Sequence, residues 1–172
     1  MKEKHKIIYY PSKNIKTETY KLEESFVTRH FYDAKDAYVR KLITAENGKK
    51  EVKHFTVKGV LAKVEFFVQD KRDGIETKYS IAKANKSIKS TKTYENGKLH
   101  GECITYDDND AIVKQEVYAD GKLVLKYLRN NANNSDITNI QIVDKESIEH
   151  LPTTEYKKLQ ENIVKNPSWF TE

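Results

Sequence analysis

The single cysteine of the chain, Cys103, lies three residues after His100 and directly after Glu102. A thiol, an imidazole and a carboxylate are the groups used in nucleophilic catalysis and in zinc sites. A catalytic Cys–His pair needs a third, orienting group, and a zinc site normally has three or four ligands. We therefore expect no catalytic residue, no metal site and no cofactor, and predict that the protein is not an enzyme. No ligand spacing is shown by the other histidines, His5, His30, His54 and His150.

A short acidic segment, Asp107-Asp108-Asn109-Asp110, is the second group of residues with chemical potential. It would suit calcium if it opened an EF-hand loop, which needs a central glycine and a glutamate at its twelfth position. The twelfth position counted from Asp107 is Tyr118. We therefore interpret the segment as an acidic turn between two strands.

The elements that position these residues repeat along the chain. The stretch 93–106 reads TYENGKLHGECITY, and its Asn96-Gly97 predicts a tight hairpin turn, because both central residues of a type I′ turn need a positive φ. Related turns are predicted at 46–49 and 119–122, whereas Leu22-Glu23-Glu24 lacks glycine and predicts an irregular turn. The aromatic residues that open successive units lie 22 to 27 residues apart, at Tyr9/Tyr10, Phe31/Tyr32, Phe55, Tyr79 and Tyr106.

A second set of aromatic residues precedes the turns, at Tyr20, Phe67, Tyr94 and Tyr118. An alternating string leads to it in two units, Leu61-x-Lys63-x-Glu65-x-Phe67 and Ile112-x-Lys114-x-Glu116-x-Tyr118. Residues two apart lie on one face of a strand. We therefore expect ladders of opposite charge across neighbouring strands, and His30 and His54 in a surface ladder on adjacent hairpins.

The other face of the third unit's first strand is wholly apolar and consists of Val60, Ala62, Val64, Phe66 and Val68. We expect this strand to lie at the centre of the structure.

The repeat pattern stops after Arg129. The stretch 130–136 is a polar linker, Ile137 to Val143 alternates as a last strand would, and Thr153/Thr154 can N-cap a helix that runs to about Lys165. The apolar stripe of this helix is Tyr156, Leu159, Ile163 and Val164, and Asn166-Pro167 ends it. We expect the helix to cap the exposed end of the sheet, with Trp169 and Phe170 as packing anchors.

The string Tyr94 to Gly101, Tyr-x-Asn-Gly-Lys-Leu-x-Gly, resembles the variant MORN repeat of the bacterial YwqK-family antitoxins. Residues 118–123 match well and residues 45–50 in part. The resemblance covers about five units, roughly residues 8 to 129. It implies a row of hairpins in an elongated antiparallel sheet, and a non-enzymatic protein that neutralises a partner toxin by binding it.

Sequence and resemblance together predict a mainly β fold with about five hairpins in one antiparallel meander and a C-terminal helix at one end. The domains are a lead-in at 1–7, the repeat domain at 8–129, and the linker, strand and helix at 130–172. The leading hypothesis for function is a protein-binding module, an antitoxin or immunity-type protein. The alternatives are a structural scaffold and a nucleic-acid-binding sheet. The partner-binding residues are unknown at this stage.

The composition bears on partners and location. A net charge of +5 arises from 31 basic and 26 acidic residues. Because lysine and glutamate alternate in the repeated string, their fields should cancel locally, and we expect neither nucleic acid nor a membrane as the partner. Open sheet edges allow a homodimer. One cysteine and the lack of a signal-peptide core indicate a cytoplasmic protein.

Overall fold

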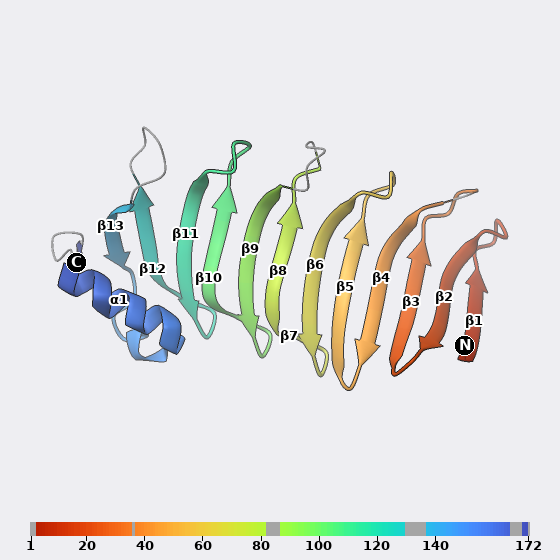
Figure 1. Ribbon diagram of the computed structural model, residues 1–172, viewed down its shortest axis with the longest axis horizontal. Coiled ribbons are helices and arrows are strands. Elements are labelled where there is room, and N and C mark those ends of the chain that lie inside the picture. The colour runs from red at the N-terminus through yellow and green to blue at the C-terminus, as the bar shows by residue number, and fades with distance from the viewer. Residues whose placement is uncertain (1–2, 36, 82–86, 130–136, 166–169, 172) are drawn as a thin grey trace.

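The computed structural model describes residues 3–35, 37–81, 87–129, 137–165 and 170–171. It confirms the mainly β fold: one open sheet, whose strands follow one another in chain order from β1 to β13, and one C-terminal α-helix (Figure 1). Along this path neighbouring strands are antiparallel, β14 pairs in parallel with β13, and the short β7 pairs with β6. Neither helix of the described residues has the length and apolar character needed to cross a bilayer.

The strands are β1 (Glu3–Tyr9), β2 (Ile15–Leu22), β3 (Ser25–Phe31), β4 (Val39–Glu46), β5 (Lys49–Phe55), β6 (Leu61–Val68), β7 (Lys71–Arg72), β8 (Gly74–Tyr79), β9 (Ile88–Glu95), β10 (Lys98–Tyr106), β11 (Ile112–Ala119), β12 (Lys122–Arg129), β13 (Ile137–Ile142) and β14 (Phe170–Thr171). The helices are a short 3₁₀ turn, η1 (Ile148–His150), and α1 (Thr153–Lys165). Strand β1 begins inside the stretch 1–7 that the sequence marks as a lead-in.

Five hairpins form the repeat: β2–β3, β4–β5, β6–β8, β9–β10 and β11–β12. The predicted turn at Asn96-Gly97 has φ values of 50° and 90°, as a type I′ turn requires. The prediction for the first unit was wrong: Leu22 pairs directly with Ser25 across a tight turn, and Glu23 takes a φ of 54°. Six consecutive residue pairs between β2 and β3 fix this register without a glycine.

Adjacent units are tied together at both ends of the strands. The Tyr10 hydroxyl donates to the Phe31 carbonyl (3.0 Å) and the Tyr32 hydroxyl to the Phe55 carbonyl (2.9 Å). At the opposite end, the Gly97 N–H donates to the Arg72 carbonyl at 2.7 Å. Each unit is therefore held by its predecessor, and the sheet is a continuous scaffold.

One expectation about strand faces was wrong. Tyr20 lies two residues before the last pair of its hairpin, whereas Phe67 and Tyr94 lie one residue before theirs. Tyr20 therefore points to the opposite face of the sheet. Opposite charges do face each other across strands, as expected, at Glu18/Arg29, Glu76/Lys92 and Glu116/Lys126. Lys63 instead pairs along its own strand, with its Nζ 2.8 Å from Glu65 Oε2.

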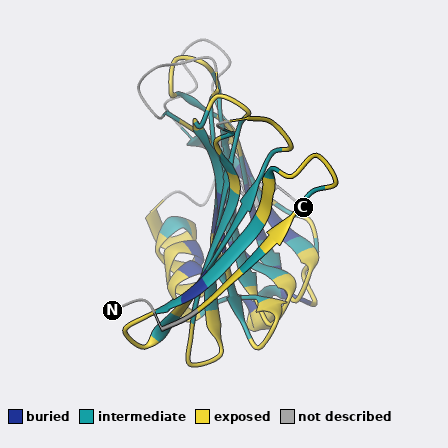
Figure 2. Ribbon diagram, turned by 90° about the vertical axis from the view of Figure 1, so that its right-hand side faces the viewer, coloured by how far each residue is buried: buried dark blue, intermediate teal, exposed yellow. Residues whose placement is uncertain are grey.

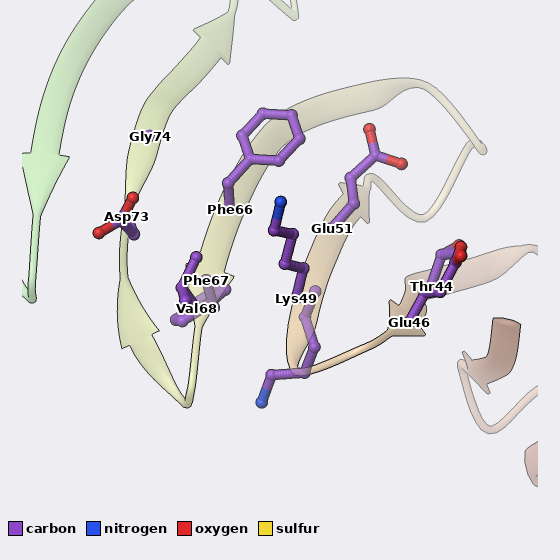
Figure 3. A pocket seen from close by; sticks show the side chains of 10 residues that line it. Thr44, Glu46, Lys49, Glu51, Phe66, Phe67, Val68, Asp73 and Gly74 are labelled. Atoms are coloured by element: carbon purple, nitrogen blue, oxygen red, sulfur yellow. The ribbon is translucent and has the colours of Figure 1, made fainter.

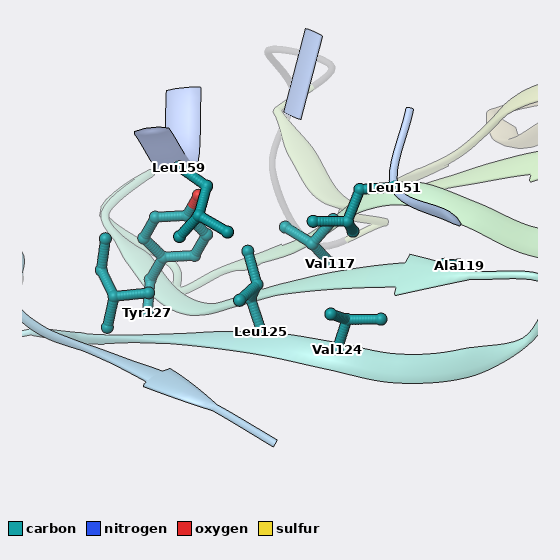
Figure 4. Close-up of a cluster of buried hydrophobic side chains, with 8 residues drawn as sticks. Val117, Ala119, Val124, Leu125, Tyr127, Leu151 and Leu159 are labelled. Atoms are coloured by element: carbon teal, nitrogen blue, oxygen red, sulfur yellow. The ribbon is translucent and has the colours of Figure 1, made fainter. Parts of the chain in front are cut away.

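The buried core lies at the C-terminal end of the sheet and not at β6. Figure 2 shows most of the sheet only partly buried. In β6 Val64 is buried, but Phe66 is 40% exposed, because no second layer covers this part of the sheet. The core cluster comprises Val117, Ala119, Val124, Leu125, Tyr127, Ile140, Leu151 and Leu159 (Figure 4).

Helix α1 covers a face of the last strands rather than the sheet edge, and β14 pairs with the outer strand β13 (Figure 1). The buried side chains of α1 are Leu159 and Glu155. The predicted stripe is therefore wrong in part: Tyr156, Ile163 and Val164 are exposed. The linker at 130–136 and the residues Asn166, Pro167 and Trp169 lie outside the described residues, as does the Phe170 side chain.

Candidate functional site

The pairing register divides the side chains of the sheet between two faces. We call the face on which α1 packs the helix face; it carries Val64, Phe66, Ile75, Val117 and Leu125. We call the opposite face the basic face; it carries Lys41, His54, Lys63 and Lys78. Both assignments follow from directly opposed residue pairs, taken strand by strand between the register shifts.

A hollow of about 420 Å³ opens on the helix face near the turns of the second and third hairpins (Figure 3). Phe66 from β6, Glu51 from β5 and Thr44 from β4 line it, with Gly74 at the start of β8. Gly74 has a φ of 108°, and a Cβ there would lie 3.2 Å from the Phe66 Cβ. The glycine therefore lets the Phe66 ring lie against the backbone of the next strand.

A second hollow, of about 530 Å³, lies between the sheet and the start of α1. Ile75 and Glu102 line its sheet side, and Glu155 lines its helix side. Asp73 and Gly74 line both hollows, so that the two are adjacent, and we refer to them together as the groove. Ile75 is 50% exposed in it, and with Phe66 it gives the groove an apolar centre.

The rim of this groove is mainly acidic. Its carboxylates are Glu46, Glu51, Asp73, Glu95, Glu102 and Glu155, beside Lys49, Lys50 and His100. At the helix end, Lys158 Nζ lies 3.5 Å from Glu102 Oε1 and 3.3 Å from Glu155 Oε1. Burial and the charge of Glu102 raise the pKa of Glu155 above its ordinary value, and Lys158 opposes this only in part.

The side chains of His100, Glu102 and Cys103 do not come together in one site. Glu102 lies opposite Val117 on the helix face, and Cys103 lies opposite Glu116 on the basic face. His100 Nε2 is 3.3 Å from the Glu95 carboxylate, and its Nδ1 accepts from the Asp120 N–H. Burial raises the pKa of the Cys103 thiol, which makes it a weaker nucleophile at neutral pH. The arrangement supplies no activated thiolate.

Metal ligands do not gather in the described part of the chain: no group of three or more His, Cys, Asp or Glu side chains there could hold an ion. The Asp107 carboxylate accepts from the N–H groups of Asn109 (2.8 Å) and Ala111 (3.0 Å). It therefore stabilises the turn between β10 and β11. His30 and His54 share one face, with Lys41 between them.

Sequence reasoning missed the groove. The apolar face of β6 and the matching glycines Gly74 and Gly101 were visible in the sequence. The position of α1 was not, because the residues that bury it, Glu155 and Leu159, do not form a simple apolar stripe.

The chain matches no protein-family model and no curated protein. Two solved structures are similar to part of it. The crystal structure of TarM is 13% identical, with a TM-score of 0.44, over 69% of this chain and 22% of that chain. A mutant of S. aureus TarM in complex with fondaparinux, alpha-GlcNAc-glycerol and UDP is 14% identical, with a TM-score of 0.41, over 66% of this chain and 22% of that chain. This chain thus spans about a fifth of the TarM chain.

Proposed function

We propose that this protein is a non-catalytic binding module that recognises another protein through the groove on its helix face. The observation that supports this most directly is the pair of exposed apolar side chains, Phe66 and Ile75, within the groove on a continuous sheet. Exposed apolar side chains that gather in a hollow with a polar rim are typical of protein-interaction sites.

The acidic rim adds to the specificity of such a site. Carboxylates around an apolar centre favour a partner that brings Lys or Arg around an apolar anchor, and they repel acidic surfaces. The bound state needs little rearrangement of the sheet, because consecutive units are tied at both ends of their strands.

We further propose that the partner is an intracellular toxin, which the protein neutralises as an antitoxin or immunity-type protein. The support is the resemblance of residues 94–101 to the variant MORN repeat of YwqK-family antitoxins. A cytoplasmic location accords with the single, buried cysteine.

The toxin proposal is tested by co-expression with each toxin encoded beside this protein. The wild-type chain should restore growth, and Phe66→Glu should fail to do so, because it places a carboxylate in the apolar centre of the groove. Phe26→Glu is the matched control, since Phe26 is exposed to a similar degree on the basic face.

Circular dichroism of both variants verifies that they fold. Failure of the wild-type chain to protect against any of these toxins would exclude the antitoxin role and leave protein binding to be tested by itself. Equal loss of protection in both folded variants would exclude the groove.

A further inference from the structure

Basic side chains form a row across the basic face. His30 of β3 lies directly opposite Lys41 of β4, and Lys41 lies opposite His54 of β5. The row continues to Lys63 of β6 and Lys78 of β8. Five successive strands of the sheet thus each contribute one cationic or titratable basic side chain at the same level.

Such a row is unfavourable for folding, because like charges directly opposite each other repel. Two buried carboxylates offset only part of it. Glu65 contacts His54 (2.7 Å) and Lys63 (2.8 Å), and Glu76 lies 3.9 Å from Lys78. Lys41 makes no side-chain ion pair or hydrogen bond within the described residues.

The positive charge near the row also affects His30, which lies at the end of the row. Burial, together with the charges of Arg40 and Lys41, lowers the pKa of His30. The buried glutamates lie beside the row rather than in it: the side chains of Lys78 and Lys63 are 48% and 24% exposed, against 6% for Glu65 and Glu76. The two glutamates therefore offset His54, Lys63 and Lys78 in part, as the alternation of Lys and Glu predicts, whereas Lys41 has no such carboxylate partner within the described residues.

We propose that this row binds the phosphodiester backbone of a single-stranded nucleic acid that lies across the strands. Neighbouring strands are about 4.8 Å apart, and the row therefore extends about 19 Å. A linear polymer with one anionic charge per residue suits a line of cations one side chain wide. The positions beside the row on β5, β6 and β8 hold the buried side chains of Val52, Glu65 and Glu76, so that the row is narrow there.

The aromatic rings of the basic face indicate that the contacts would be to phosphate groups and not to bases. Single-strand platforms stack bases on open aromatic rings. Here Lys50 Nζ covers the Phe67 ring at 5.6 Å, and the Arg72 guanidinium covers the Tyr94 ring at 5.1 Å. The exposed ring of Phe26 lies four residues along β3 from His30, away from the row. The apolar side chain beside the row, Val52, is buried and therefore cannot insert into a lipid bilayer. Binding should therefore be independent of base sequence. The site is separate from the groove, because it lies on the opposite face.

The test is fluorescence anisotropy with a dye-labelled oligothymidine of about a dozen nucleotides, titrated with the full chain at several NaCl concentrations. Each phosphate contact on a single strand contributes about −0.7 to the slope of log K against log salt, so that three lysines give a slope of about −2. The double variant Lys41→Gln/Lys78→Gln should bind about tenfold or more weakly at about 0.1 M salt, with a slope shallower by about 1.4.

The matched control is Lys58→Gln/Lys98→Gln, which removes the same charge from turn-end positions outside the row. It should change the affinity by less than about twofold. Absence of binding by the wild-type chain, or equal weakening in both double variants, would overturn the proposal. So would binding of polyglutamate, or of phosphatidylserine vesicles, that is as tight as the oligonucleotide and equally dependent on Lys41 and Lys78.

Discussion

At the scale of single residues, the glycines of the repeat have a steric function that the sequence alone could predict. Gly74 and Gly101 occupy matching positions and have φ values of 108° and 106°. A Cβ on Gly101 would lie 3.3 Å from the Thr93 Cβ, as one on Gly74 would lie 3.2 Å from the Phe66 Cβ. The repeat therefore needs glycine there for both its backbone and its close packing.

Gly101→Ala should lower the free energy of unfolding by about 2 kcal/mol or more, because it adds a tight contact to an unfavourable φ. Gly48→Ala is the control: Gly48 also has a positive φ, but no atom lies within 4 Å of its would-be Cβ. It should cost about 1 kcal/mol. Urea denaturation measures both, and equal losses would show that packing at Gly101 contributes nothing.

Glu65 is a residue whose role could not be predicted from the sequence. The spacing predicted partners on neighbouring strands, and His54 and Arg72 do reach it from there, but Lys63 contacts it along its own strand. Burial is the largest single effect and would raise the pKa of Glu65, yet the hydrogen bonds and charges of Lys63 and His54 together outweigh it and hold this pKa below its ordinary value.

A lowered pKa in the folded state means that the ionised form of Glu65 stabilises the protein above the ordinary glutamate pKa of about 4.3. This stabilisation is lost as pH falls through the folded-state pKa. Glu65→Gln should therefore be less stable than the wild type by roughly 1–3 kcal/mol at neutral pH, and the difference should shrink below about pH 4. Urea denaturation across this pH range tests it. A difference that stays constant with pH would contradict the assignment.

At the scale of elements, the positions of the hairpins follow from local turn sequences, whereas the face of the sheet on which a side chain lies does not. Asn-Gly and Asp-Gly turns, with their φ requirements, predicted the second, fourth and fifth hairpins. Tyr20 appeared equivalent to Tyr94 by its neighbours along the chain, yet the turn of its hairpin puts it on the other face. A shift of one residue between an aromatic and its turn reverses the face, and only the pairing register reveals it.

Helix α1 shows the same limit. The threonines at 153 and 154 and Asn166-Pro167 predicted its bounds closely, although the helix begins at Thr153 itself. Which side of the helix is buried depends on the sheet surface beneath it. Leu159 contacts the core formed by β11, β12 and β13, whereas Val164 points into solvent.

Leu159→Ala should therefore lower the free energy of unfolding by about 2–5 kcal/mol, because Leu159 is only 2% exposed and truncation leaves a cavity. Val164→Ala, at a position that is 82% exposed, should change it by less than about 0.5 kcal/mol. Thermal and urea denaturation of the two variants measure these changes in the free energy of unfolding. Comparable effects would mean that α1 does not pack on the sheet through Leu159.

At the scale of the whole molecule, an open, single-layered sheet has two accessible faces, and they differ in chemistry. The helix face presents an apolar groove with an acidic rim, and the basic face presents a row of cations. The sequence predicted the sheet, its order and its helix, because these follow from periodicity and turns. It did not predict how charge divides between the faces, since that depends on which residues meet across strands.

The central claim is that the groove on the helix face binds a protein. The most direct measurement is a pull-down of the tagged chain from a lysate of its own cells, washed at low and high salt, with wild type, Phe66→Glu and Phe26→Glu in parallel and the bound proteins identified. We predict that one stoichiometric protein survives the high-salt wash with wild type and Phe26→Glu and is lost with Phe66→Glu. A bound protein retained equally by Phe66→Glu, or none retained by the wild type, would contradict the claim.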